Sequence, residues 1–228
     1  MPSTSSSRQS LNWTGGRSVV RDRGTVLTIG HSNHTAEVFL DLLIRHRVTA
    51  LADVRSAPYS RFAPHFNRGQ LAKTLKASGI RYLYLGRELG GRSNDQSCYD
   101  QGHVRYDRLA HMPGFQDGLQ RVQRGAEEYR VALMCAEKEP LHCHRTLLVG
   151  HELDRRGVDV AHILPDGQLE PHMNAMNRLL AECNLDADGD LFSRRRSRDE
   201  RIVEAIACQT RRFGHAIRRA VDGPEQKD

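Results

Sequence analysis

The sequence predicts an α/β fold of three layers, with helices on both faces of a mostly parallel, Rossmann-like sheet and a helical extension at its C-terminal end. Two observations lead to this prediction. Short apolar runs alternate with segments whose apolar residues recur at helical spacing, which favours parallel strands connected by helices. Unusual polar residues follow these apolar runs rather than precede them, as is typical of sheets that bind ligands at the carboxyl ends of their strands.

The elements are expected in a regular order. The first strand is predicted at 26–30, and Thr35 is expected to cap a helix that carries Val38, Leu42 and Leu43 on one face. The segment 86–112 is rich in glycine and poorly periodic, so we expect a lid or substrate loop there. Further strands are predicted at 49–54, 80–85, 131–135 and 158–164, and further helices at 69–77, 115–129, 145–156 and 171–183.

The chain is expected to divide into three parts. Residues 1–24 form a flexible N-terminal segment, residues 25–183 form the α/β domain, and residues 184–228 form a basic helical tail. One broad apolar stripe in the tail favours packing against the domain over binding to nucleic acid. The stripe consists of Ile202, Ile206, Phe213 and Ile217.

Charge and cysteine content restrict the class of protein. The net formal charge is +6, but residues 25–183 contain 20 Lys and Arg against 18 Asp and Glu, so a polyanionic partner is only weakly supported. The sequence contains no apolar segment long enough for a bilayer and no secretory signal, which predicts no membrane association and a cytoplasmic location. Five scattered cysteines fit a reduced compartment better than a disulfide framework.

The segment 131–146 concentrates reactive side chains. Cys143 and His144 precede a predicted helix, whose exposed amides together with Arg145 would stabilise a thiolate or a bound anion. Equally, Cys143 could cap the turn while Arg145 pairs with Glu137 or Glu139. Cys135 ends an apolar strand and is either a second nucleophile or a packing residue. Glu137 would orient an imidazole or exchange a proton, or else anchor the loop.

Arginines in the segment that follows the second predicted strand suggest an anion clamp. Arg55 and Arg61 flank a loop that two prolines force to turn, so their guanidinium groups could be presented together. The alternative is that Arg55 pairs with Asp53 and that Arg61 is solvated. Because five polar clusters follow the five predicted strands, we expect them to converge on one site. The candidate ligand-binding residues are His31, Ser32, Arg55, Ser60, Arg61 and Arg145.

The sequence predicts neither a metal site nor a cofactor. Soft ligands are present near 135–144, but no paired C-x-x-C occurs, and His142 and His144 would point in different directions unless the loop folds sharply. A glycine-rich dinucleotide loop and a P-loop are both absent. The sequence gives no indication of an oligomeric state.

Four ordered blocks resemble the domain-of-unknown-function 488 family. They read TIGHSNHTAEVFLDLL, DVRSAPYSRFAPHFN, YLYLGRELGGR and CAEKEPLHCHRTLL, and they span about residues 25–170. The resemblance implies an α/β protein in which the DVR, E-P and CHR elements line a common cleft; the tail after Cys183 lies outside it. The family pattern falls on Gly30, His31, Ser32, Asp53, Arg55, Pro58, Ser60, Glu137, Cys143, His144 and Arg145.

These residues favour an enzyme-like domain that binds a small anionic or nucleotide-like substrate at the carboxyl ends of the strands. A thiol-dependent transferase or hydrolase would use Cys143 or Cys135 as nucleophile and His144 or Glu137 for proton transfer. Two alternatives remain open at this point: a nucleic-acid-binding or processing module, and a noncatalytic ligand sensor with the same cleft.

Overall fold

The structure is a computed structural model, and it describes residues 24–185 and 196–213. Apart from Gly24, the predicted flexible segment 1–24 lies outside the described residues, and so does Ile217 of the predicted tail stripe. No helix in the described part of the chain is both long enough and apolar enough to cross a membrane.

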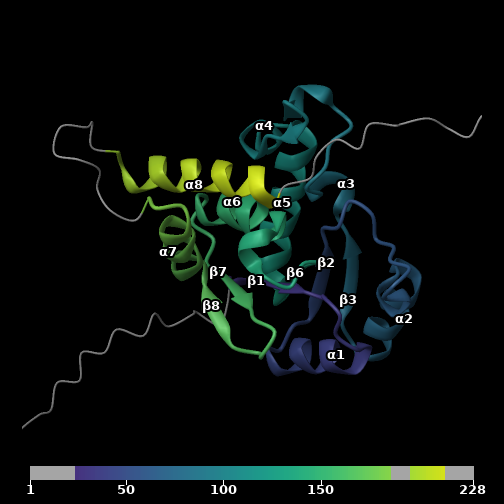
Figure 1. Cartoon of the computed structure of the whole chain (residues 1–228). Coiled ribbons are helices and arrows are strands. Elements are labelled where there is room, and N and C mark those ends of the chain that lie inside the picture. Colours follow the sequence, from purple (N-terminus) through teal and green to yellow (C-terminus); the bar gives the residue numbers. More distant parts are fainter. Residues whose placement is uncertain (1–23, 186–195, 214–228) are drawn as a thin grey trace, which may run out of the picture.

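Six strands form one sheet in the order β3-β2-β6-β1-β7-β8 (Figure 1). β8 pairs antiparallel with β7, and all the other strands of this sheet pair in parallel, so the predicted mostly parallel α/β fold is confirmed. β6 lies between β1 and β2, which places the end of the cysteine-bearing strand in the middle of the sheet. The strands are β1 (Val26–Gly30), β2 (Ala50–Asp53), β3 (Arg81–Tyr84), β6 (Val131–Cys135), β7 (Val160–Ile163) and β8 (Leu169–Pro171).

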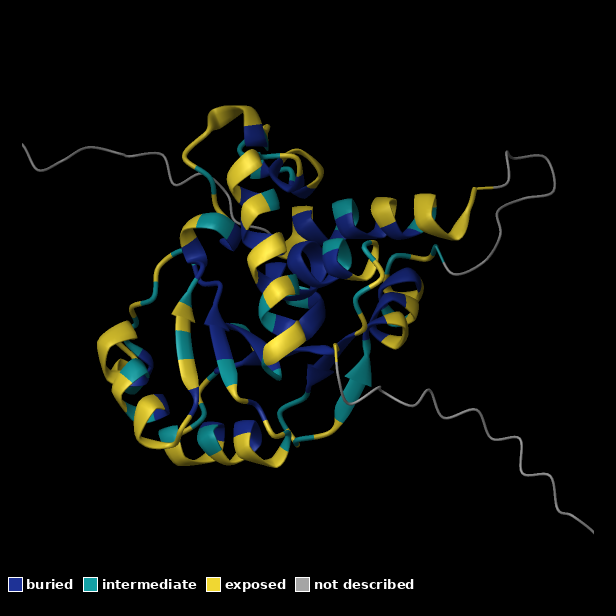
Figure 2. Cartoon of the chain, turned by 180° about the vertical axis from the view of Figure 1, so that it is seen from behind, coloured by how far each residue is buried: buried dark blue, intermediate teal, exposed yellow. Residues whose placement is uncertain are grey.

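Helices cover both faces of this sheet, because neighbouring residues of a strand point to opposite sides. Met134 packs in an apolar cluster with residues of α1 and α2, whereas Cys135 packs in a second cluster with residues of α5, α7 and α8. The central strands are therefore buried, and the surrounding helices expose only their outer faces (Figure 2). The main helices are α1 (Ala36–Arg45), α2 (Arg68–Ala77), α5 (Pro113–Glu128), α6 (His151–Asp154), α7 (His172–Glu182) and α8 (Arg198–Phe213).

Local signals explain where several of these helices begin. The Thr35 side chain accepts a hydrogen bond from the Val38 backbone N–H at 3.3 Å, so the predicted cap of α1 is confirmed. Pro113 is the first residue of α5, where its missing N–H costs no hydrogen bond. The predicted helix at 145–156 begins as a π-helical turn, η4 (Arg145–Gly150), and continues as α6.

The segment 86–112 is folded into short helices and strands, so the expectation of one long loop was wrong, whereas its role as a lid or substrate segment stays a prediction. It contains α3 (Gly86–Leu89), the 3-10 turn η2 (Gln96–Cys98), the paired strands β4 (Tyr99–Asp100) and β5 (His103–Val104), and α4 (Tyr106–Ala110). Its apolar side chains join the core on the α5 side of the sheet. Elements of two to five residues are too short to show a periodicity, which is why the pattern resembled a loop.

Helix α8 packs against the α/β domain. Ile202 and Ile206 are buried, and the helix packs against α7, as the apolar stripe predicted. Phe213 stacks on His142 with ring centroids 3.8 Å apart. In Figure 1, α8 and α4 lie at the same end of the molecule, and α8 also contacts β5 and η3 (Pro140–His142). Because η3 follows β6, this helix covers part of the carboxyl edge of the sheet.

Candidate active site

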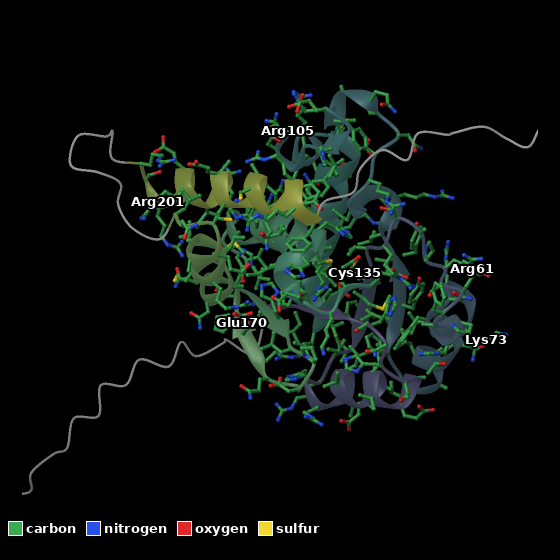
Figure 3. All side chains as sticks on the ribbon, in the orientation of Figure 1. Arg61, Lys73, Arg105, Cys135, Glu170 and Arg201 are labelled. Carbon is green, nitrogen blue, oxygen red and sulfur yellow. The ribbon has the colours of Figure 1, made fainter. Side chains whose placement is uncertain are left out.

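Two sulfurs, an imidazole and a carboxylate meet at the end of β6. The thiols of Cys135 and Cys143 donate to the same oxygen of Glu137, Oε2, at 3.0 and 3.1 Å. His144 Nδ1 lies 3.6 Å from Cys135 Sγ and 3.9 Å from Cys143 Sγ. The predicted catalytic group is therefore assembled from one strand end and the loop that follows it; Figure 3 shows Cys135 in the interior of the molecule.

Backbone carbonyls fix the orientation of His144 and Arg145. His144 Nε2 donates to the Val54 carbonyl at 3.0 Å, which leaves Nδ1 facing the sulfurs. Arg145 is fully buried and donates to the carbonyls of Glu137 and Lys138 at 2.6 and 3.3 Å. The guanidinium therefore holds the Glu137 loop through its backbone rather than through an ion pair with the Glu137 or Glu139 carboxylate, as the sequence had allowed.

The surroundings shift the pKa values of the two thiols in opposite directions. Burial raises the pKa of Cys135 well above its usual value, and the hydrogen bond with Cys143 raises it further. Burial would also raise the pKa of Cys143, but the hydrogen bond from Cys135, the charge of Arg145 and the contact with His144 outweigh it and lower this pKa well below its usual value. Burial likewise opposes charge on His144, yet the neighbouring Cys143 and Glu137 raise its pKa.

Close backbone packing keeps this cluster in place. A Cβ at Gly30 would collide with the Glu137 carbonyl, the same oxygen that accepts from Arg145. A Cβ at Gly91 would lie 2.8 Å from the ring of His144. Both positions therefore require glycine if the Glu137 loop and the imidazole are to stay where they are.

Arg55 lies in a second buried network, which includes Phe66 from the apolar cluster that packs with α1 and α2. Its guanidinium makes two hydrogen bonds with the Asp53 carboxylate, at 2.9 and 2.7 Å, and a third with the Phe66 carbonyl at 2.8 Å. Nη1 lies 3.2 Å from His31 Nε2, while His31 Nδ1 lies 2.9 Å from the Ser32 carbonyl and stacking on Phe66 covers the ring. Pairing with Asp53, the alternative weighed for Arg55, is what the structure shows.

The remaining candidate ligand-binding residues do not gather at the sulfurs. Ser32 is partly exposed at a left-handed backbone position, φ 46°, just after β1. Ser60 accepts from the Ala63 amide and lies in the loop before α2. Arg61 is exposed and lies at the outer side of the molecule, apart from Cys135 (Figure 3). Arg55 and Arg61 therefore do not form a shared clamp in this structure.

Convergence of polar residues is limited to the three central strands. The ends of β1, β2 and β6 meet through the contacts of His31 with Arg55 and of His144 with Val54. The residues after β3 and β7 point elsewhere: Glu88 pairs with Arg121 on α5, and Asp166 accepts from the Gln168 amide. The segment after β3 still reaches the middle at Gly91, which packs against the ring of His144, so it contributes backbone rather than polar side chains there.

The sulfur cluster also has the donor set of a thiophilic metal site. Ligand atoms of Cys135, Cys143 and His144 all lie within 4.8 Å of one another, with Glu137 Oε2 beside both sulfurs. A tetrahedral zinc ion uses such ligands, and the hydrogen bond of His144 Nε2 to a carbonyl is the usual orienting contact. The sequence predicted no metal here because spacing alone did not reveal that Cys143 and the adjacent His144 reach the same point as Cys135.

Tyr106 is a neighbour of the cluster that sequence reasoning missed. Burial, and after it the nearby Cys143, Cys135 and Glu137, raise the pKa of this phenol well above its usual value. Tyr106 comes from α4, inside the segment expected to be a loop. The signal available in the sequence was a single tyrosine within an Arg-rich stretch, which by itself points to no role.

The comparisons with known proteins place the chain in a family. No curated protein and no solved structure matches it. A family model described as "Domain of unknown function DUF488" matches residues 35–151, which include Arg55 and the entire sulfur cluster but exclude β1 and α8. The match covers half of the chain, and the resemblance carried by the DVR and CHR blocks is confirmed. The chain thus belongs to the family described as Domain of unknown function DUF488.

Proposed function

We propose that the protein is a thiol-dependent transferase or hydrolase acting on a small anionic or nucleotide-like substrate, with Cys143 as nucleophile. The observation that carries this proposal is the convergence of Cys143, Cys135, Glu137 and His144 at hydrogen-bonding distance. A buried packing cysteine needs neither a carboxylate nor an imidazole beside its sulfur. A nucleophile is activated by a proton acceptor or by a nearby cation, and Cys143 has both in Glu137 and Arg145.

The contacts assign a step to each residue. The Cys143 thiol passes its proton to Glu137 Oε2, and Arg145, His144 and the Cys135 thiol stabilise the thiolate. Cys143 Sγ then forms a bond to the electrophilic atom of the substrate while the bond to the leaving group breaks, and His144 Nδ1 protonates the departing electron pair. Water, in a hydrolase, or a second substrate, in a transferase, gives a proton back to His144 Nδ1 as it displaces the sulfur, which regenerates the thiolate and the protonated imidazole.

Mapping covalent adducts tests the proposal with general electrophiles in place of the natural substrate. The reduced full-length chain is treated with small aryl esters and iodoacetamide, and modified peptides are identified by mass spectrometry over time. Adducts are expected first on Cys143, with release of the acyl group from Cys143 but not of the acetamide. Glu137→Gln and His144→Gln are expected to slow acylation by roughly 100-fold, the usual contribution of a proton-transfer group.

Cys183→Ser provides the matched control, because Cys183 is a partly exposed free thiol at the end of α7. It should leave the rate at Cys143 unchanged. Labelling that favours Cys183 and Cys208, with Cys143 no faster than an ordinary thiol, would rule out the nucleophile. A rise in Cys143 labelling only after treatment with EDTA would show instead that the cluster holds a metal.

Binding measurements separate the two alternatives. A nucleic-acid module would bind oligonucleotides with an affinity that falls steeply with salt. A noncatalytic sensor would bind a small ligand and form no adduct on Cys143. The buried face of α8, with Ile202 and Ile206 in the core, makes this helix part of the fold rather than a free basic arm.

A further inference from the structure

A cavity of about 370 Å³ lies at the carboxyl edge of the sheet, next to the sulfur cluster. The hairpin of β4 and β5, α4, η4 with α6, and α8 each contribute residues to its lining. Its volume is within the range of small-molecule sites, which starts near 300 Å³. The fold therefore encloses room for one compact ligand at this edge.

Apolar side chains form much of the lining. Leu147 and Leu148 come from η4, directly after the CHR residues, and Ile206 comes from the opposite side on α8. Tyr106 belongs both to this lining and to the surroundings of the sulfurs, so it separates the cavity from the cluster. A ligand that fills the space must present an apolar or aromatic face to these side chains.

Polar groups in the lining lack partners. Both ring nitrogens of His151 and Nδ1 of His103 are buried and form no hydrogen bond in the part of the chain that the structure describes. Buried polar atoms nearly always have a partner. Burial lowers the pKa of His151, so its neutral ring offers one donor and one acceptor.

One arginine of the lining is available for an anion. Arg105 is paired with Asp107 and Arg155 with Glu152. Arg211, on α8, is exposed and makes no ion pair with any described residue. An anionic group on the ligand could therefore contact Arg211 without breaking a native pair.

We propose that this cavity binds a planar heterocycle that carries an anionic group, the chemistry of a nucleoside monophosphate. The ring packs between Leu148 and Ile206, and its phosphate meets Arg211. The donor and acceptor edge of the ring meets His151 when the imidazole turns its buried nitrogens toward the cavity. An aliphatic chain would leave the imidazole nitrogens unpaired, and an inorganic anion would leave the apolar lining uncovered. This inference goes beyond the proposed function, because Tyr106 separates the lining from the sulfurs and binding itself does not require the thiol.

Calorimetric titration of the full-length chain tests the site, with purine and pyrimidine nucleoside monophosphates as probes and inorganic phosphate as the comparison. We expect one nucleotide to bind with a stoichiometry of one and at least tenfold more tightly than phosphate. Ala207→Phe, which fills the cavity from α8, and His151→Phe, which removes both ring nitrogens, should each weaken binding at least tenfold. Ala181→Phe introduces the same side chain at an exposed position of α7 and should bind like the unmodified chain.

Two results would overturn the inference: no nucleotide binding more tightly than phosphate, or equal binding by Ala207→Phe and Ala181→Phe. Circular dichroism of each variant verifies that it is folded, and His151→Phe keeps the test available if Ala207→Phe does not fold. Binding without any adduct on Cys143 would support the cavity and reject the proposed thiol chemistry. Adduct formation on Cys143 without nucleotide binding would support the thiol chemistry and reject the cavity as a nucleotide site.

Discussion

The buried imidazole of His31 should make the protein sensitive to mild acid. Burial, followed by the positive charge of Arg55, lowers the pKa of His31 from 6.5 to about 4, even though Asp53 and Glu137 act in the opposite direction. In the unfolded chain the same ring takes up a proton near pH 6.5. The unfolded state therefore binds more protons than the folded state between these two values, and stability is lost as the pH falls through that window.

The magnitude follows from the two pKa values. A pH of 5 lies about 1.5 units below the pKa of the unfolded ring, so that ring is protonated, whereas the folded ring remains mostly neutral. Acidification from pH 7 to pH 5 therefore lowers the free energy of unfolding by about 2 kcal/mol at this one residue. His162 and His172 are also buried with lowered pKa values and act in the same direction. His144, whose pKa is raised, acts oppositely.

A variant isolates the contribution of His31 from the others. His31→Gln keeps a polar group beside Arg55 but cannot titrate, and urea unfolding followed by circular dichroism measures both proteins at pH 7, 6 and 5. We expect His31→Gln to be the less stable protein at pH 7 and the gap between the two to shrink by about 2 kcal/mol at pH 5. A gap that stays constant over this range would refute a neutral, buried His31.

Three further predictions concern the packing and chemistry around the sheet edge. Gly30→Ala forces its Cβ against the Glu137 carbonyl and should cost about 1–3 kcal/mol in thermal unfolding; full stability would show that the Glu137 loop moves freely. Asp53→Asn leaves the buried guanidinium of Arg55 without its counter-charge and should cost about 3–5 kcal/mol, whereas Asp41→Asn breaks only an exposed pair and should cost less than about 1 kcal/mol; equal losses would contradict the buried network. Iodoacetamide should modify Cys143 at lower pH than Cys135, because their pKa values are shifted in opposite directions; simultaneous labelling would contradict this order.

The sequence was sufficient for five of the six strands of the sheet and for the residues of the sulfur cluster, whereas the antiparallel strand β8 (Leu169–Pro171) was not predicted. Strands such as 131–135 are continuous apolar runs, and a run of that kind bounded by polar turns is a strong local signal. Cys135 ends this strand, and Glu137, Cys143 and His144 follow it within nine residues, so the position of the strand predicted that they are neighbours but not that the sulfurs and the imidazole reach the same point.

Contacts between segments that are distant in the sequence could not be predicted in the same way. Arg55 had the chemistry of an anion clamp, and only the structure shows that Asp53, Phe66 and His31 already accept from its guanidinium. Tyr106 reaches the sulfurs through α4, an element of five residues without a detectable pattern. Both outcomes depend on tertiary packing, which a single sequence does not encode in its periodicity.

Helix α8 lines the cavity, whereas the loop after β6 carries the thiols. The sulfurs lie inside residues 35–151, while Ile206 and Arg211, on the opposite side of the cavity, come from a helix beyond that match. Exchanging this helix would reshape the cavity, provided that Phe213, which stacks on His142 in the loop after β6, is kept. The ligand preference of the cavity could in this way be re-engineered by grafting a C-terminal helix that retains this contact.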